Sequence, residues 1–117
     1  MLHKIGTLKE LDATELSLPE CVMTELTQDI AILDCEHGES RSWRESGGYS
    51  VVVETTEDLQ EFTKIVDVER HPCEWATQIG RDSGWLSALF LFGNEYAIMA
   101  FMPVSISPNA ILKDLEV

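Results

Sequence analysis

Two short segments of the sequence bring cysteine and histidine close together, and these two residue types are common zinc ligands. The segments are Cys-Glu-His at 35–37 and His-Pro-Cys at 71–73, which together supply Cys35, His37, His71 and Cys73. Zinc-binding pairs usually have roughly two to four residues between the ligands, whereas each segment here has only one. Residues two apart share one face of a strand, but they lie far apart around a helix. We therefore expect no metal and no cofactor, and we keep these four residues as the alternative.

Other catalytic patterns do not occur in the sequence. There is no G-x-S-x-G, no P-loop and no G-x-G-x-x-G motif. The adjacent carboxylates Glu57 and Asp58 fit the first turn of a helix, where the helix dipole favours negative charge. His71 stands before Pro72 and fits a turn. We expect a protein that is not an enzyme and has no catalytic residues.

The polar segment 37–48 is the best candidate for a binding site. It is rich in glycine and serine, and it places Trp43 between Arg41 and Arg44. Tryptophan and arginine are enriched at binding hot spots. We predict that Arg41, Trp43 and Arg44 contact a partner, and the competing interpretation is that Trp43 packs back onto the core.

The charge of the chain limits the classes of partner. The sequence has 21 acidic and 8 basic residues, for a net charge of −13. Such a field repels nucleic-acid backbones and favours a basic protein partner. No apolar run is long enough to span a membrane, and the first fifteen residues do not read as a signal peptide. The three cysteines have irregular spacing, and we expect them to be free and buried. Together, these features predict a cytoplasmic protein that binds neither DNA, RNA nor a membrane.

The helices and strands follow from apolar spacing. A helix over residues 19–36 is predicted by one apolar stripe made of Leu18, Val22, Leu26, Ile30 and Leu33. The alternative there is a shorter helix followed by a strand. A strand over 49–55 and a helix over 56–66 come next, with Thr55 or Thr56 as the helix cap.

Three further strands and a final helix complete the prediction. The strands cover 73–79, 85–92 and 96–102, with a tight turn at Gly93 and Asn94, and Ser107 caps the last helix. The order is helix-strand-helix-strand-strand-strand-helix in one domain, 1–117. The fold class is α+β, with helices packed on one face of a mostly antiparallel sheet of four to five strands. The first fifteen residues hold either a short strand around residues 5–8 or loosely packed chain.

The hairpin over 85–102 is apolar on both of its faces. Leu86, Ala88 and Phe90 alternate with Leu89 and Leu91, and the second strand is similarly apolar throughout. Central strands buried on both sides have this pattern. If the helices of this chain leave one face uncovered, a second copy or another protein must cover it. We expect a homodimer; a self-covered monomer and a foreign partner are the alternatives.

The stretch from Ile32 to Leu59 resembles small uncharacterised acidic proteins of Gram-positive bacteria, often encoded near prophage-like or mobile DNA. The matching residues are Leu33, Asp34, Glu36, Gly38, Glu39, Arg41, Gly47, Gly48, Tyr49, Glu54, Glu57, Asp58 and Leu59. His37 stands where those proteins often have an aromatic residue. The resemblance implies a genome context and no activity. We expect a non-enzymatic binding module, either an immunity or antitoxin-like protein or a phage-related accessory protein; the alternative is a metal protein or enzyme that uses His37, His71 and the cysteines.

Overall fold

The computed structural model describes residues 2–36, 48–93 and 96–116, without the side chains of residues 32–36 and 116. The elements follow one another as β1 (His3–Ile5), α1 (Leu8–Thr14), α2 (Glu20–Glu36), β2 (Tyr49–Val52), α3 (Thr56–Ile65), β3 (Trp75–Gln78), β4 (Trp85–Phe92), β5 (Tyr96–Pro103), the 3₁₀ turn η1 (Val104–Ile106), α4 (Asn109–Leu112) and β6 (Leu115–Glu116). The α+β class is confirmed. The predicted order is present from α2 to α4, but it is wrong for the whole chain, because β1 and α1 precede it and β6 follows it.

The strands form one mixed sheet in the order β1-β2-β5-β4-β3-β6. Antiparallel pairing builds the β3-β4-β5 meander, as consecutive strands with short connections predict. β1 also pairs antiparallel with β2, which is distant in the sequence. Parallel pairing joins β2 to β5, with Tyr49 opposite Ile98, and β3 to the two-residue β6. The sheet is therefore not purely antiparallel, and with β6 it has one strand more than predicted.

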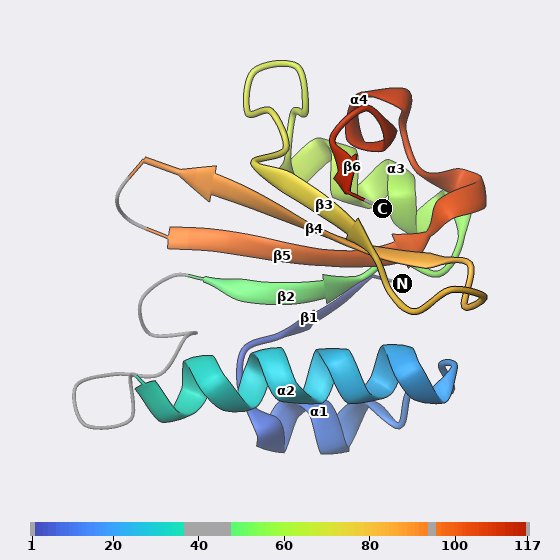
Figure 1. Ribbon diagram of the computed structural model, residues 1–117. Helices are drawn as coiled ribbons and strands as arrows, with labels where there is room; N and C mark the ends of the chain where they lie inside the picture. Colours follow the sequence, from blue (N-terminus) through green and yellow to red (C-terminus); the bar gives the residue numbers. More distant parts are fainter. Residues whose placement is uncertain (1, 37–47, 94–95, 117) are drawn as a thin grey trace.

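Helices cover both faces of this sheet, whereas the sequence had predicted a single covered face. Figure 1 shows α1 and α2 on one side and α3 and α4 on the other. We call these two sides the α2 face and the α3 face. The difference arises because α2 packs on one face and α3 on the other, and the unpredicted helix α1, residues 8–14, lies beside α2.

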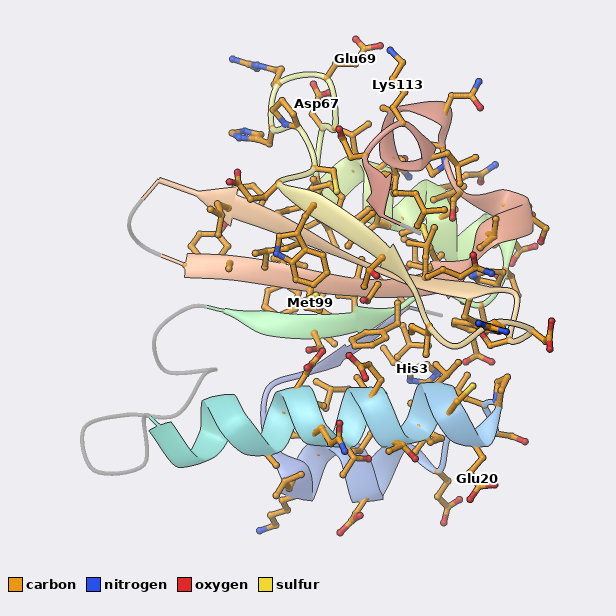
Figure 2. All side chains as sticks on the ribbon, viewed as in Figure 1. His3, Glu20, Asp67, Glu69, Met99 and Lys113 are labelled. Carbon is orange, nitrogen blue, oxygen red and sulfur yellow. The ribbon has the colours of Figure 1, made fainter. Side chains whose placement is uncertain are left out.

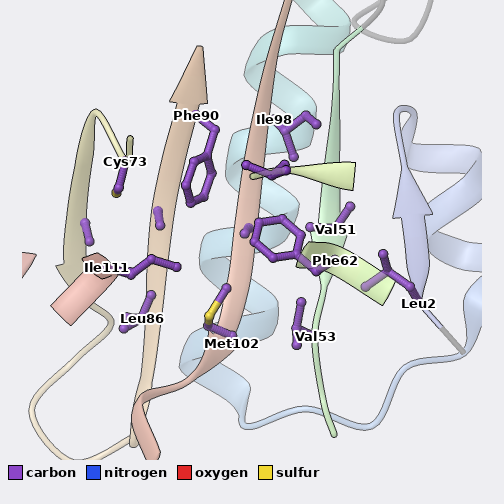
Figure 3. Packing of buried hydrophobic residues seen from close by; sticks show 14 residues of the cluster. Leu2, Val51, Val53, Phe62, Cys73, Leu86, Phe90, Ile98, Met102 and Ile111 are labelled. Atoms are coloured by element: carbon purple, nitrogen blue, oxygen red, sulfur yellow. The ribbon is translucent and has the colours of Figure 1, made fainter. Parts of the chain in front are cut away.

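Each face carries its own apolar core. On the α3 face, Phe62 meets Phe90 edge to face with ring centroids 5.5 Å apart, and Ile111 packs with them (Figure 3). On the α2 face, Val22, Leu26 and Ile30 of α2 are fully buried against the sheet, which confirms three positions of the predicted stripe. Leu33 lies outside the described side chains.

These two cores explain why the hairpin formed by β4 and β5 is apolar on both faces. Leu86, Ala88 and Phe90 belong to the α3 face, while Leu89, Met99 and Phe101 belong to the α2 face. Helices of the same chain thus cover both sides of β4 and β5, except at the end next to the β4–β5 turn. Over this covered part, no second copy is needed to shield the hairpin from water.

Local caps and turns fix the ends of the elements. The Thr55 side chain accepts a hydrogen bond from the backbone N–H of Asp58 at 3.1 Å, and the Asp58 carboxylate accepts one from the backbone of Thr55, which forms a capping box. Gly93 has a φ of 62°, the left-handed conformation that the predicted turn requires. Ser107 does not cap α4 as predicted. Its hydroxyl instead donates to the Pro103 carbonyl, and its backbone N–H closes η1.

Candidate functional site

Aromatic side chains gather at the end of the sheet where β4 ends and β5 begins. Phe92 and Tyr96 are opposite each other in the β4–β5 register, and both point to the α3 face. Their rings are stacked with centroids 4.8 Å apart and an angle of 5° between the planes. Both side chains are partly exposed, so this stack forms part of the molecular surface.

The same row continues across β2 to the edge strand β1. Tyr49 pairs with Ile98, two residues beyond Tyr96, and alternation therefore places Tyr49 and Tyr96 on the same face as neighbours. Burial raises the pKa of Tyr49 above its usual value, and the nearby Tyr96 adds to that shift. The ammonium group of Lys4 lies 5.7 Å from the centroid of the Tyr49 ring, within the distance of a cation–π contact.

His71 extends the row at its other end. The His71 ring is 4.9 Å from the Phe92 ring, with an angle of 40° between the planes. The loop after α3 holds it there, because the backbone N–H of His71 donates to the Asp67 carbonyl at 2.7 Å. The side chains of Asp67 and Glu69 in this loop point away from the protein body (Figure 2). We call His71, Phe92, Tyr96 and Tyr49 the aromatic row.

Within residues 2–36, 48–93 and 96–116, no helix lies over the part of the sheet that carries the aromatic row. In Figure 1, α3 and α4 lie over the end of the sheet where β4 starts, away from the β4–β5 turn. There the core side chains Leu86, Met102 and Ile111 are fully buried. The four members of the row are each partly or fully exposed. Within the described part of the chain, their exposed surface is open to a planar or cationic group of another molecule.

A shallow hollow of about 180 Å³ adjoins the row at Tyr49. Lys4, Gly6 and Glu10 line the rest of it. The Glu10 carboxylate is held by the backbone N–H of Gly6 at 3.0 Å, because Glu10 closes the N-terminal cap of α1. The hollow thus presents one carboxylate, one ammonium and one phenol ring to solvent.

The structure does not test the binding residues that were predicted from the sequence. Arg41, Trp43 and Arg44 lie outside the described residues, and so does His37. Cys35 belongs to the last turn of α2, and its side chain is likewise outside the description. These predictions therefore stay predictions.

The remaining zinc candidates lie in different surroundings. His71 is exposed and packs on Phe92, whereas Cys73 is buried and donates its thiol hydrogen to the Trp75 carbonyl at 3.0 Å. Burial, followed by the negative charge of Asp114, raises the pKa of the Cys73 thiol to about 11, which disfavours the thiolate that binds metal. Among the residues described, no three histidine, cysteine or carboxylate side chains cluster as metal ligands would. Cys21 is exposed, although the sequence had suggested buried cysteines.

The aromatic row was not predicted from the sequence. The apolar pattern predicts Phe92 and Tyr96 as strand residues and Tyr49 as the start of a strand. The signal that could have found part of it is the pair of aromatic residues flanking the turn at 93–95. The contribution of Tyr49 depends on the parallel β2–β5 register, which no local pattern encodes.

No protein-family model matches the sequence, and comparisons with curated proteins and with solved structures found no significant match. Over the part of the chain that the structure describes, no helix has both the length and the apolar character needed to cross a bilayer.

Proposed function

We propose that this protein is a non-enzymatic binding module whose partner is a basic protein. The observation that carries the proposal is an exposed aromatic row on a chain with a net charge of −13. Exposed aromatic clusters are enriched at protein interfaces, and an acidic surface steers a basic partner toward them. An immunity or antitoxin-like neutraliser of a basic toxin fits this chemistry, and so does a phage-related accessory protein.

Charge supports a protein partner over a nucleic acid. Acidic side chains project on both sides of the sheet, such as Glu20 at the start of α2 and Glu69 in the loop after α3 (Figure 2). A polyanion that approaches the aromatic row must enter this negative field, whereas a basic protein gains from it. The alternative of a metal protein or enzyme has less support, because the buried Cys73 thiol is held protonated and hydrogen-bonded.

Capture from a lysate of the source organism tests the proposal. The immobilised protein is loaded at low salt and eluted with a salt gradient, and bound proteins are identified by mass spectrometry. We expect a protein of high isoelectric point that elutes as ionic strength rises, because screening weakens exposed charge pairs. An unrelated acidic domain of similar net charge is the matched control. Retention of nothing specific at low salt would contradict the proposal.

A further inference from the structure

We infer that the aromatic row binds arginine side chains of the basic partner, with Lys4 as an internal competitor for the same ring surface. This inference rests on the proposed function and names the chemical group that the surface recognises. The observation behind it is the Lys4 ammonium placed 5.7 Å from the Tyr49 ring centroid.

The Lys4 contact shows that this part of the row already accepts a cation. The face of a phenol ring carries negative potential, and a cation within about 6 Å of the centroid is attracted to it. Lys4 reaches Tyr49 from the edge strand β1, through a flexible and exposed side chain. An incoming cation can therefore displace the Lys4 ammonium without disturbing the fold.

A guanidinium group suits this surface better than an ammonium group does. It is planar, stacks on aromatic rings and is less strongly hydrated, so it loses less on leaving water. Tyr49 and Tyr96 also place two phenol groups close enough for one to raise the pKa of the other. Phenol oxygens accept hydrogen bonds, and a guanidinium has five N–H donors. Ring faces and hydroxyls together match an arginine side chain.

The charge around the row favours the same occupant. The Glu10 carboxylate lines the hollow beside Tyr49, and the whole chain carries a net charge of −13. A stacked nucleobase would use the same ring surfaces, but its phosphate would meet this negative field. We therefore favour arginine side chains of a protein segment over a nucleotide.

The test compares two short synthetic peptides that differ only in carrying arginine or lysine, with affinity measured by calorimetry at low salt. We expect the arginine peptide to bind more tightly. Tyr96→Leu should weaken its binding by about fivefold, because leucine keeps apolar contact and loses the ring. Tyr96→Phe should retain most of the affinity. Leu91→Ala is the matched control, because Leu91 is exposed on the opposite face of the same hairpin. Melting curves establish that each variant is folded.

The Lys4→Ala variant gives the sharpest result. Removing the internal competitor should tighten the binding of the arginine peptide by about twofold to fivefold. Lys9→Ala, which removes the same charge from an exposed position on α1, should have a smaller effect. Weaker binding in Lys4→Ala would contradict the inference, and so would equal affinities for the two peptides. Adenosine monophosphate is the third probe, and its binding at higher affinity than the arginine peptide would also overturn it.

The inference and the proposed function fail in different ways. A basic partner captured equally well by the wild type and by Tyr96→Leu would overturn the inference and leave the proposed function standing. An arginine peptide that binds the aromatic row, together with no basic partner in the lysate, would overturn the proposed function alone.

Discussion

Phe92 and Tyr96 stack almost parallel across the final pair of the β4–β5 ladder, with ring centroids 4.8 Å apart. This stack joins the hairpin end to the loop after α3, because His71 contacts Phe92. The same two rings therefore contribute to stability and form the centre of the proposed binding surface.

The stacked pair predicts a measurable coupling energy. In a double-mutant cycle with Phe92→Ala and Tyr96→Ala, the free energies of unfolding should be non-additive by about 0.5–1.5 kcal/mol, which is typical of aromatic pairs. Urea unfolding of the four proteins measures this. As a control, Leu91→Ala combined with Tyr96→Ala should be additive, because Leu91 points to the other face of the sheet. Additivity in the aromatic cycle would show that the stack contributes nothing.

Two serines with opposite surroundings give a second prediction. The Ser87 hydroxyl is buried in β4 with no hydrogen-bond partner in the described part of the chain, whereas the Ser107 hydroxyl donates to the Pro103 carbonyl at 2.8 Å. Ser87→Ala should raise the free energy of unfolding by up to about 1 kcal/mol, because a buried hydroxyl without a partner costs desolvation. Ser107→Ala should lower it by about 1 kcal/mol. Denaturant midpoints distinguish the two signs, and a loss of stability in Ser87→Ala would contradict the first.

Asp29 on α2 predicts how stability depends on pH. Burial, reinforced by the charge of Glu25, raises the pKa of Asp29 from 3.8 to about 6. Between about pH 4 and 6 the folded chain then holds a proton that the unfolded chain has lost, so stability falls as pH rises through this window. A shift of this size in a fully buried group would correspond to about 3 kcal/mol, and partial exposure reduces it to about 1 kcal/mol.

Asp29→Asn should therefore stabilise the protein at pH 7 by about 1 kcal/mol and flatten the profile between pH 4 and 6. Glu25→Gln should stabilise it less, because it removes only the repulsion. Asp12→Asn, on the exposed side of α1, is the control and should leave the profile unchanged. A wild-type profile that rises from pH 4 to 6 would show that the sign is wrong.

The pKa of Asp58 is shifted in the opposite direction, and this shift predicts how the protein loses stability in acid. Burial alone would raise the pKa of Asp58, but hydrogen bonds to its charged form, including those from the backbone of Glu54 and Thr55, lower the pKa below 3.8. This contribution to stability is present above the unfolded pKa and is lost as pH falls through the lower, folded pKa. Stability should therefore decline below about pH 4, and this decline should be smaller in Asp58→Asn.

The covering of both sheet faces predicts the mass of the protein in solution. Light scattering should give one chain, 13.1 kDa, at micromolar concentration, because α1, α2, α3 and α4 already cover most of the hairpin that had suggested a dimer. A mass twice as large would mean that another surface associates. The Tyr96→Leu variant would then identify the aromatic row as that surface if it restored the single-chain mass.

Local patterns predicted those parts of the fold that depend on neighbouring residues. The spacing of Val22, Leu26 and Ile30 placed α2, Thr55 placed the start of α3, and Gly93 placed the hairpin turn. Ser107 was misassigned because a serine hydroxyl can accept at a helix start or donate to a preceding carbonyl, and the structure uses the second option.

The remaining features depend on contacts that are distant in sequence. β1 has three residues and no alternating pattern of its own, so its place beside β2 follows only from pairing. The aromatic row requires Tyr49 to lie beside Tyr96, which depends on the parallel register of Tyr49 with Ile98. The local sequence pattern therefore predicted β2 and β5 and placed Tyr49 and Tyr96 in them, but it did not predict that these two residues form one surface.

The pairing of Tyr49 with Ile98 also constrains how the chain folds while it is being made. Until β5 has left the ribosome, β2 can pair only with β1, and a two-stranded ribbon is marginal in water. The apolar stripe of α2 then lacks Met99 and Phe101, against which it packs. Nascent chains arrested before Pro103 should therefore be digested rapidly by protease, and resistance should appear abruptly once the last strands emerge.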